Sequence, residues 1–245
     1  MPNKKTLILT GASRGIGHTT VKRFGEAGWR VFTCSREDVP EECRRDPNWA
    51  HHIPADLGDP EDRRRFIDEV NAQIGDGPIH ALVNNAGVSP KTPYKERLGV
   101  LHGEIADWRQ VFELNFYAAL ELSRGFAAGL ARAKGAIVNV TSIAGHAAHP
   151  FAGSAYSISK AALSALTREM AVEFAGLGVR VNAVAPGEIQ TEMIGAEYEP
   201  LITRIPMHRM GTTAEVAGVI FQLCNPDFGY VTGTEIFITG GQHLY

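Results

Sequence analysis

Residues 6–17 read TLILTGASRGIG, a short apolar run followed by Gly11, Gly15 and Gly17. The run has the length of a buried strand, and the residues after it have the spacing of a helix. A helix that begins after a glycine turn can hold a pyrophosphate, because its free N–H groups and dipole attract anions and glycine leaves them uncovered. The common G-x-G-x-x-G spacing is not kept, since position 20 is Thr20. The loop is therefore a candidate phosphate site of unusual spacing.

The same loop allows two other interpretations. Residues 11–15 also read G-x-S-x-G, the turn on which α/β-hydrolases present a nucleophilic serine, here Ser13, and His243 follows in a suitable order. In that fold an oxyanion-hole loop precedes the nucleophile, whereas this turn follows the very first strand. The third interpretation is a turn without a ligand. The loop alone leaves the three interpretations open.

Composition and charge narrow the class of protein. The chain has 245 residues, 44% of them hydrophobic, and a formal net charge of −3. These values predict one domain over residues 1–245 and give no electrostatic reason to expect a nucleic-acid partner. The arginine run 63–65 lies among acidic residues, which is typical of a solvated helix face. No apolar run approaches the ~20 residues of a membrane helix, so no membrane span is expected.

The cysteine pattern indicates the cellular compartment in which the protein is expected. Cys34, Cys43 and Cys224 are odd in number and show no C-x-x-C spacing. Reduced thiols of this kind are typical of the cytoplasm. The apolar run behind Lys4 and Lys5 is too short for a signal peptide. We therefore expect a cytoplasmic protein.

Apolar runs alternate with helical patterns along the whole chain. Strands are predicted at 6–10, 30–34, 51–55, 80–85, 136–142, 179–185 and 235–239, and helices at 16–27, 60–74, 104–132, 155–176 and 213–224. This alternation predicts an α/β fold with a doubly wound parallel sheet covered on both faces. Two irregular segments, 88–103 and 187–212, have the length of functional loops, and we expect 187–212 to act as a lid over the substrate.

Tyr156 and Lys160 stand four residues apart in a predicted helix and so lie on one face. A nearby ammonium group lowers the pKa of a phenol from its usual value of about 10, which suits it to proton exchange. The pair alone is also compatible with an ordinary amphipathic helix. Three predicted strands end at Ser142, in the run 84–87 (NNAG) and at 186–187 (PG), all at the carboxyl edge where ligands of such sheets bind.

Together these residues resemble the short-chain dehydrogenase/reductases, from Lys5 to Gly241. The family markers stand as Thr10-Gly11-x-x-x-Gly15-x-Gly17, Asn84-Asn85-Ala86-Gly87, Asn115, Ser142, Tyr156-x-x-x-Lys160 and Pro186-Gly187 with Thr191. The resemblance implies a Rossmann fold of seven parallel strands in the order 3-2-1-4-5-6-7. It also implies that the glycine loop is the family's form of the nucleotide loop.

The resemblance implies four catalytic residues. Tyr156 would be the general acid in reduction and the base in oxidation, and Ser142 would hydrogen-bond the carbonyl oxygen. Lys160 would lower the tyrosine pKa and hold the nicotinamide ribose, and Asn115 would position a water in a proton relay. The implied cofactor-binding residues are Gly11, Ser13, Arg14, Gly15, Ile16, Gly17, Ser35, Arg36, Asp56, Leu57, Asn84, Ala86, Gly87, Tyr156, Lys160, Pro186, Gly187, Ile189 and Thr191.

The end of the second strand indicates which nicotinamide cofactor binds. NAD-dependent folds carry an acidic residue there for the ribose 2′-OH, whereas NADP-dependent folds carry a basic group for the 2′-phosphate. This position reads Ser35 and then Arg36, and Arg14 of the glycine loop can reach the same place. NADP(H) is therefore the predicted cofactor. The alternative is that Glu37 or Asp38 binds a ribose hydroxyl of NAD.

The loop 145–153 is expected to border the substrate. The interval between Ser142 and Tyr156 is one residue longer than is common in the family, and the extra residue most simply falls in this loop. His146, His149 and Glu188 are candidate substrate contacts. No metal site is expected, because no cysteine or acidic residue in the loop completes a ligand set, and His51 and His52 point to opposite faces of a strand.

The resulting prediction is an NADP(H)-dependent oxidoreductase that interconverts a small carbonyl compound and its alcohol. The alternatives are an NAD-dependent alcohol or polyol dehydrogenase, a 3-oxoacyl-carrier-protein reductase and a catalytically silent nucleotide-binding regulator. The expected partner is a small-molecule carbonyl or alcohol substrate, with no nucleic acid and no membrane. The resemblance further implies a homo-oligomer, either a tetramer or a dimer.

Overall fold

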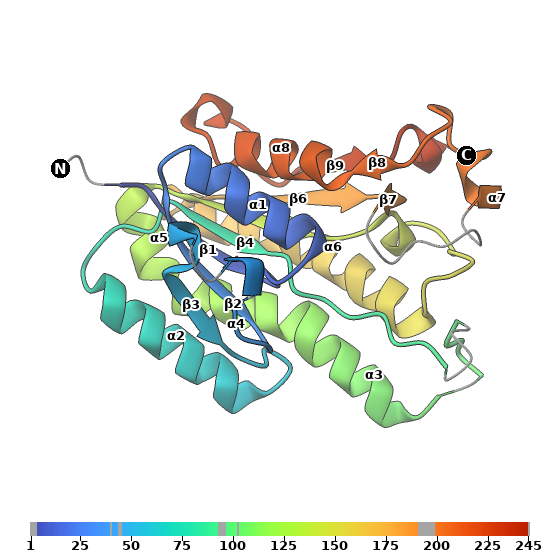
Figure 1. The fold of residues 1–245 in the computed structure, drawn as a ribbon, viewed down its shortest axis with the longest axis horizontal. Coiled ribbons are helices and arrows are strands. Elements are labelled where there is room, and N and C mark those ends of the chain that lie inside the picture. Colours follow the sequence, from blue (N-terminus) through green and yellow to red (C-terminus); the bar gives the residue numbers. More distant parts are fainter. Residues whose placement is uncertain are drawn as a thin grey trace.

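A computed structural model describes residues 4–39, 41–43, 46–92, 97–101, 103–190 and 199–244. Its main sheet has seven parallel strands in the order β3-β2-β1-β4-β5-β6-β9, which confirms the predicted order (Figure 1). The strands are β1 Thr6–Thr10, β2 Arg30–Ser35, β3 His51–Pro54, β4 Ala81–Asn84, β5 Ala136–Val140, β6 Arg180–Pro186 and β9 Glu235–Ile238. Two short strands, β7 Ile189–Gln190 and β8 Gly211–Thr212, pair beside it.

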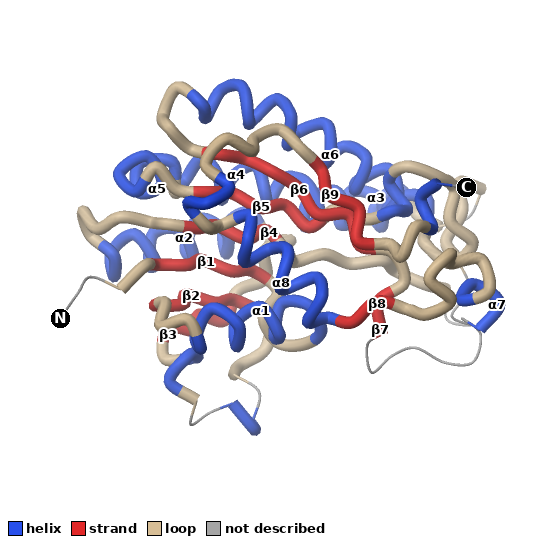
Figure 2. The backbone as a smooth tube through the Cα atoms, turned by 90° about the horizontal axis from the view of Figure 1, so that it is seen from above, coloured by secondary structure: helices blue, strands red, loops and turns tan. Residues whose placement is uncertain are grey.

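Helices cover both faces of the sheet. α1 (Gly15–Glu26) and α8 (Thr213–Leu223) pack together on one face, and α2 (Pro60–Ile74), α3 (Ile105–Phe112), α4 (Ala118–Gly125) and α6 (Ser154–Ala175) cover the other (Figures 1 and 2). Strand residues alternate between the two cores: Ile8 packs with Phe66 of α2, whereas Leu7 and Leu9 pack with Phe24 of α1. This alternation follows from the two-residue period of a strand. The remaining helices are α5 Ala127–Ala133 and α7 Glu199–Ile202.

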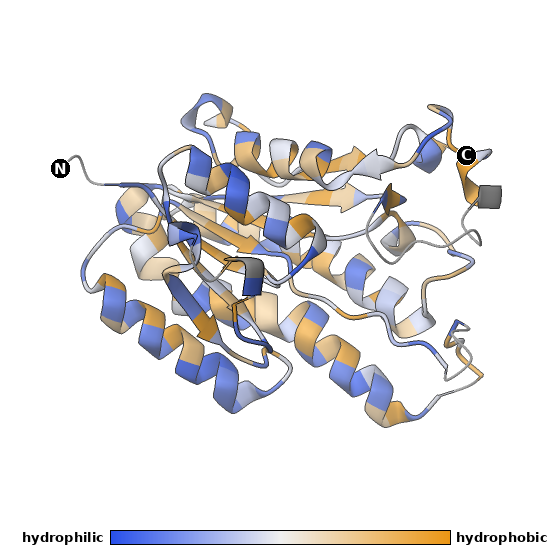
Figure 3. Ribbon diagram, viewed as in Figure 1, coloured by the Kyte–Doolittle hydropathy of each residue, from blue (hydrophilic) through white to orange (hydrophobic). Residues whose placement is uncertain are grey.

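The predicted helix 60–74 is confirmed at both ends. Asp59 caps it by accepting hydrogen bonds from the N–H groups of Glu61 (2.7 Å) and Asp62 (3.1 Å), and Pro60 follows at the first helical position. Figure 3 shows hydrophilic residues on much of α2 and a hydrophobic sheet beneath it. In the part of the chain that the structure describes, no helix is long and apolar enough to cross a membrane.

The prediction of one continuous helix over 104–132 is wrong. α3 runs into a π-helical turn, Glu113–Tyr117, before α4 begins, and α5 is separated from α4 at Phe126. A π-helical turn is a short local feature within a longer helix, so the apolar periodicity of the whole segment does not reveal it. This turn matters for the site, because it contains Asn115.

The prediction that residues 63–65 lie on a solvated helix face is wrong for Arg63. Arg63 is 1% exposed and forms ion pairs with Glu113 (2.9 Å) and Glu121 (3.0 Å). It also donates to the carbonyl oxygen of Leu57 at 2.9 Å. Arg65, in contrast, is exposed and pairs within α2. Arg63 thus joins α2, the loop after β3 and the π-helical turn.

Candidate active site

The glycine loop after β1 is packed too closely for side chains. A Cβ atom at Gly17 would lie 2.1 Å from the carbonyl oxygen of Gly11, and Gly11 itself has φ +69°. Asn85, after β4, donates from its amide to the carbonyl oxygens of Thr10 (3.0 Å) and Gly11 (2.9 Å). The Gly11 carbonyl group is backbone, and the Asn85 amide is held by its two hydrogen bonds, so neither can move away from an added Cβ atom. Glycine is therefore required at Gly11 and Gly17.

The loop opens into a cavity suited to a dinucleotide. Arg14, at the N-cap of α1, makes no side-chain capping bond, so the first N–H groups of the helix have no side-chain partner there. The cavity measures about 290 Å³ and brings together residues from the ends of β1, β2, β3 and β4. Its lining residues are Gly11, Ser13, Arg14, Ile16, Gly17, Cys34, Ser35, Arg36, Ala55, Asp56, Leu57, Asn85, Ala86, Gly87, Val88 and Leu114.

The hydrolase interpretation of this loop has no geometric support. Ser13 lines the cavity, whereas His243 hydrogen-bonds Thr239 at 2.6 Å and stacks on Phe237 beside β9. In the described residues no hydrogen bond joins Ser13 to a histidine. Burial raises the pKa of the neighbouring Cys34 thiol to about 12, so this thiol is not a nucleophile either.

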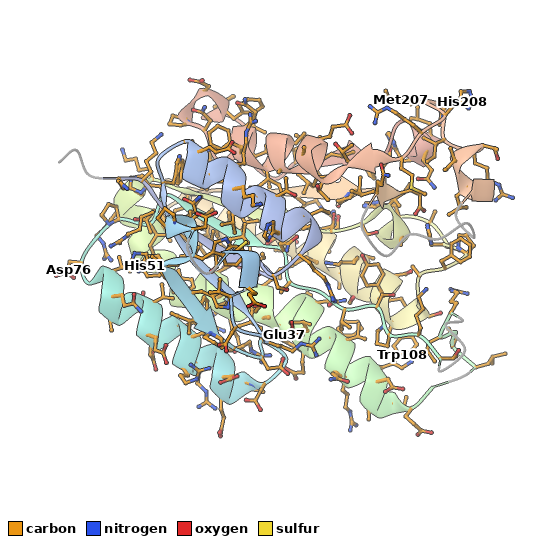
Figure 4. The ribbon with its side chains drawn as sticks, in the orientation of Figure 1. Glu37, His51, Asp76, Trp108, Met207 and His208 are labelled. Carbon is orange, nitrogen blue, oxygen red and sulfur yellow. The ribbon has the colours of Figure 1, made fainter. Side chains whose placement is uncertain are left out.

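Two arginines lie at the far end of the cavity. Arg14 and Arg36 are both exposed, and neither forms an ion pair within the described part of the chain. Ser35 ends β2 and donates from its hydroxyl to the carbonyl oxygen of Glu37 at 2.8 Å. Figure 4 shows Glu37 beyond the carboxyl ends of β2 and β3, with His51 at the other end of β3. Two exposed guanidinium groups are therefore available at this edge of the cavity, next to the exposed carboxylates of Glu37 and Asp38.

Tyr156 and Lys160 do not line this cavity, but Lys160 lies next to Gly87, which does. Lys160 is 3% exposed, and its ammonium group donates to the carbonyl oxygen of Val140 at 2.7 Å. A Cβ atom at Gly87 would lie 3.2 Å from Lys160 Nζ and 3.3 Å from Asn115 Oδ1. The glycine after β4, the lysine of α6 and the asparagine of the π-helical turn therefore meet at one point.

The pKa values of this pair differ from the expectation. Burial raises the pKa of Tyr156, the negative charge of Glu188 raises it further, and hydrogen bonding with Ser142 partly offsets both. Burial also lowers the pKa of Lys160 to about 8. Lys160 lies over the tyrosine ring, 5.7 Å from its centre. The lowering of the Tyr156 pKa by Lys160 is therefore not seen in this structure.

Asn115 uses its whole side-chain amide to join two elements. Its Nδ2 donates to the carbonyl oxygen of Val88 and to Ser159 Oγ, both at 3.0 Å, and its Oδ1 accepts from Val88 N–H at 2.8 Å. These bonds hold the loop after β4 against α6. The role of Asn115 in positioning a water stays a prediction.

Asn84 does not line the cavity. It is buried, and its amide donates to Asn139 Oδ1 at 2.8 Å, on the side of the sheet covered by α4 and α6. Because successive strand residues face opposite sides, its neighbour Asn85 takes the position in the cavity. The family motif NNAG contained this residue, but sequence reasoning did not assign it a role.

The segment after β6 is described only in part. Pro186 ends β6, and Gly187 N–H donates to the carbonyl oxygen of Ile238 at 3.0 Å. Ile189 is buried in β7. Thr191 and the rest of 191–198, the middle of the predicted lid, lie outside the described residues.

The candidate substrate contacts lie in two histidine–carboxylate pairs. His149 Nε2 lies 2.7 Å from Glu188 Oε1, and His146 Nε2 lies 3.0 Å from Glu235 Oε2 of β9. Ser154, which the sequence offers as an alternative to Ser142 two residues before Tyr156, accepts a hydrogen bond from Arg97 at 3.2 Å. The sequence identified His149 and Glu188 separately, but nothing in their spacing revealed that they pair.

Comparison with known proteins identifies the family of this chain. A family model described as enoyl-(acyl carrier protein) reductase matches residues 11–243. Protein FixR of Bradyrhizobium diazoefficiens is 52% identical over 242 residues, which are 98% of this chain and 87% of that protein. Galactitol 2-dehydrogenase (L-tagatose-forming) of Cereibacter sphaeroides is 36% identical over 249 residues, 97% of this chain and 94% of that protein.

One solved structure is similar to this chain over almost the whole length of the chain. It is an oxidoreductase of the short-chain dehydrogenase/reductase family from Brucella ovis, in complex with a partially ordered NAD, and it is 50% identical. The match covers 97% of this chain and 100% of that one, with a TM-score of 0.83. Given this likeness, the glycine cradle and the Tyr156–Lys160 pair, the chain belongs to the short-chain dehydrogenase/reductase family.

Proposed function

We propose that this protein is an NADP(H)-dependent oxidoreductase that interconverts a small carbonyl compound and its alcohol. The observation that carries the proposal is the meeting of Ser142, Tyr156 and Lys160 beside the glycine cavity. Ser142 lies close enough to Tyr156 to lower the pKa of the phenol by hydrogen bonding, and the Lys160 ammonium lies 5.7 Å from the centre of the tyrosine ring. A phenol, a hydroxyl and an ammonium at the carboxyl edge of such a sheet form a general acid–base site.

Each side chain has a distinct task in the reduction. Ser142 donates a hydrogen bond to the carbonyl oxygen and so fixes it beside Tyr156. Tyr156, whose pKa is raised by burial, holds its proton at neutral pH and delivers it to that oxygen. Lys160 supplies positive charge behind the ring, and Asn115 keeps the loop after β4 in place. The bound nicotinamide supplies the hydride chemistry.

The choice of NADP(H) rests on the end of β2. Ser35 stands where an acidic residue would repel a 2′-phosphate, and the guanidinium groups of Arg14 and Arg36 are free to pair with one. NAD is the rival cofactor, since the similar Brucella ovis oxidoreductase is in complex with NAD. Glu37 and Asp38 follow Arg36 and would then bind the ribose hydroxyls.

A second candidate is an NAD-dependent polyol dehydrogenase, which the likeness to a galactitol 2-dehydrogenase favours. We also propose a cytoplasmic location, because Cys34 and Cys224 are buried and form no disulfide. A homo-oligomeric assembly is proposed by analogy with the family.

A panel of small ketones, aldehydes and polyols tests the proposed function. Oxidation of NADPH and NADH by the carbonyl compounds, and reduction of NADP and NAD by the alcohols, are followed by absorbance. We expect turnover of at least one carbonyl compound with NADPH and a lower kcat/KM with NADH. Comparable turnover with NADH would contradict the cofactor assignment, and no turnover with either cofactor would contradict the reaction.

A further inference from the structure

Glu188 joins two segments that the sequence predicts to border the substrate. It follows Gly187 after β6 and is 8% exposed. Its carboxylate accepts from His149 Nε2 at 2.7 Å, and its carbonyl oxygen accepts from Gly211 N–H at 2.9 Å. The loop 145–153 and the segment after β6 are thereby connected through one buried carboxylate.

The backbone around His149 determines which ring nitrogen carries the proton. The N–H groups of Phe151 and Ala152 both donate to His149 Nδ1, each at 3.2 Å. A nitrogen that accepts two N–H donors cannot carry a hydrogen itself, so we assign the proton to Nε2, which donates it to Glu188. The imidazole is neutral in this arrangement, and the pair carries a net negative charge.

This charge faces the reacting residues. Glu188 acts on Tyr156 electrostatically, since its carboxylate is one of the causes of the raised tyrosine pKa. In the described part of the chain, His149 is the one side chain that donates to Glu188. A buried carboxylate with one neutral donor is costly unless a further donor reaches it. The substrate is the natural source of that donor.

We propose that Glu188 is a specificity-determining residue whose carboxylate accepts a hydrogen bond from a hydroxyl group next to the reacting carbon of the substrate. The proposal rests on the proposed function and narrows the substrate class to hydroxyketones and the corresponding diols. His149 acts as a positioning residue that fixes the orientation of the carboxylate. An anionic group in the same place is rejected, because it would face an uncompensated negative charge.

Three matched ketones test this: one with a hydroxyl on the adjacent carbon, one with a hydrogen there, and one with a carboxylate. Hydrogen bonds to charged groups contribute ~1.5–3 kcal/mol, so the ratio of kcat/KM for the hydroxyketone over the plain ketone should fall about ten- to a hundredfold in Glu188→Gln. The relative activity toward the carboxylate ketone should rise. Glu173→Gln, an exposed carboxylate on α6, is the matched control and should leave both ratios unchanged.

A second variant separates the effect of the orientation of the Glu188 carboxylate from the effect of its charge. His149→Phe keeps an aromatic ring but removes the donor, so the hydroxyl preference should weaken while rejection of the carboxylate ketone persists. Circular dichroism of each variant checks that the fold is retained. If Glu188→Gln leaves both ratios as in the wild type, the specificity role of Glu188 is overturned, although Tyr156-dependent turnover and the proposed function stand.

A binding measurement tests Glu188 without any turnover. Calorimetry compares a vicinal diol with the matched mono-alcohol on the wild type and Glu188→Gln, each in the presence of NADPH, which cannot take a hydride from an alcohol. The diol should bind about tenfold more tightly to the wild type, and the variant should lose this difference. An equal preference for the diol in the wild type and in Glu188→Gln would overturn the inference about Glu188. A failure of the proposed function would show differently, as the absence of turnover in the wild-type protein.

Discussion

The ammonium group of Lys160 lies 5.7 Å from the centre of the Tyr156 ring. The same group donates to the Val140 carbonyl oxygen at 2.7 Å, so it is held at the end of β5, behind the tyrosine. Lys160 is almost fully buried, and burial lowers its pKa to about 8. A charged lysine in this position costs folding free energy, and we expect that cost to be measurable.

Lys160→Met should stabilise the protein at neutral pH. The pKa of Lys160 is about 8 when folded and near its ordinary 10.5 when unfolded, so the unfolded chain binds more protons between these values. The wild type should therefore gain stability, relative to the variant, as pH rises from 8 to 10.5. The variant's advantage below pH 8 should be about 3 kcal/mol at most, at ~1.4 kcal/mol per pKa unit.

Urea denaturation of both proteins between pH 7 and pH 10 measures this difference. Lys22→Met, at an exposed position of α1, is the control and should follow the wild type throughout. The prediction is contradicted if Lys160→Met is less stable than the wild type at pH 7 and the difference does not change with pH. Lys160 would then not be a buried charge that destabilises the fold.

Arg63→Met should destabilise the fold. The change removes two ion pairs and leaves the carboxylates of Glu113 and Glu121 without their partner. Breaking a buried pair costs about 3–5 kcal/mol, and we expect the lower end because both glutamates are about a third exposed. Denaturant unfolding measures it, with Arg64→Met on the exposed side of α2 as the control. A loss within about 0.5 kcal/mol, as for surface changes, would contradict the structural role of Arg63.

Gly17→Ala should weaken nucleotide binding and stability together. Its Cβ atom would lie 2.1 Å from the Gly11 carbonyl oxygen, which is backbone and cannot turn away. We expect cofactor affinity to fall at least about tenfold, the equivalent of ~1.4 kcal/mol, as measured by fluorescence titration with NADPH. Gly218→Ala in α8 is the matched control: nothing lies within 4 Å of its Cβ, and it should gain about 0.4–1 kcal/mol of stability. Unchanged affinity in Gly17→Ala would exclude the loop as the phosphate site.

Arg36→Ala should raise KM for NADPH about ten- to a hundredfold, because a hydrogen bond between charged groups contributes ~1.5–3 kcal/mol. KM for NADH, which lacks the phosphate, should change little. Arg14 lines the same cavity and can compensate, so the double variant of Arg14 and Arg36 is the cleaner test. Equal effects on the two cofactors would mean that Arg36 does not bind the 2′-phosphate.

The sheet could be predicted from the sequence because the patterns that indicate strands and helix ends are local. β1 has the predicted bounds, and α2 begins where Asp59 and Pro60 require. The π-helical turn at Asn115 was missed, because Asn115 bonds to Val88 and Ser159, which are distant from it in sequence.

The errors at the site have the same origin. Arg63 looked like a surface residue because its partners Glu113 and Glu121 lie on another helix. Asn84 and Asn85 exchanged roles, since the sequence motif does not show which side of the strand end faces the cavity. The proximity of Tyr156 and Lys160 could be predicted because both residues lie one turn apart on a single helix.

The central claim is that Tyr156 supplies the proton, and Tyr156→Phe tests it most directly. The change removes the hydroxyl but keeps the ring, so kcat for the best carbonyl substrate should fall about 10²–10⁴-fold while the Kd for NADPH stays nearly constant. Tyr230→Phe, at a fully exposed position, should match the wild type in both. A Tyr156→Phe protein that keeps more than about a tenth of wild-type kcat would contradict the account, because a general acid contributes far more than that.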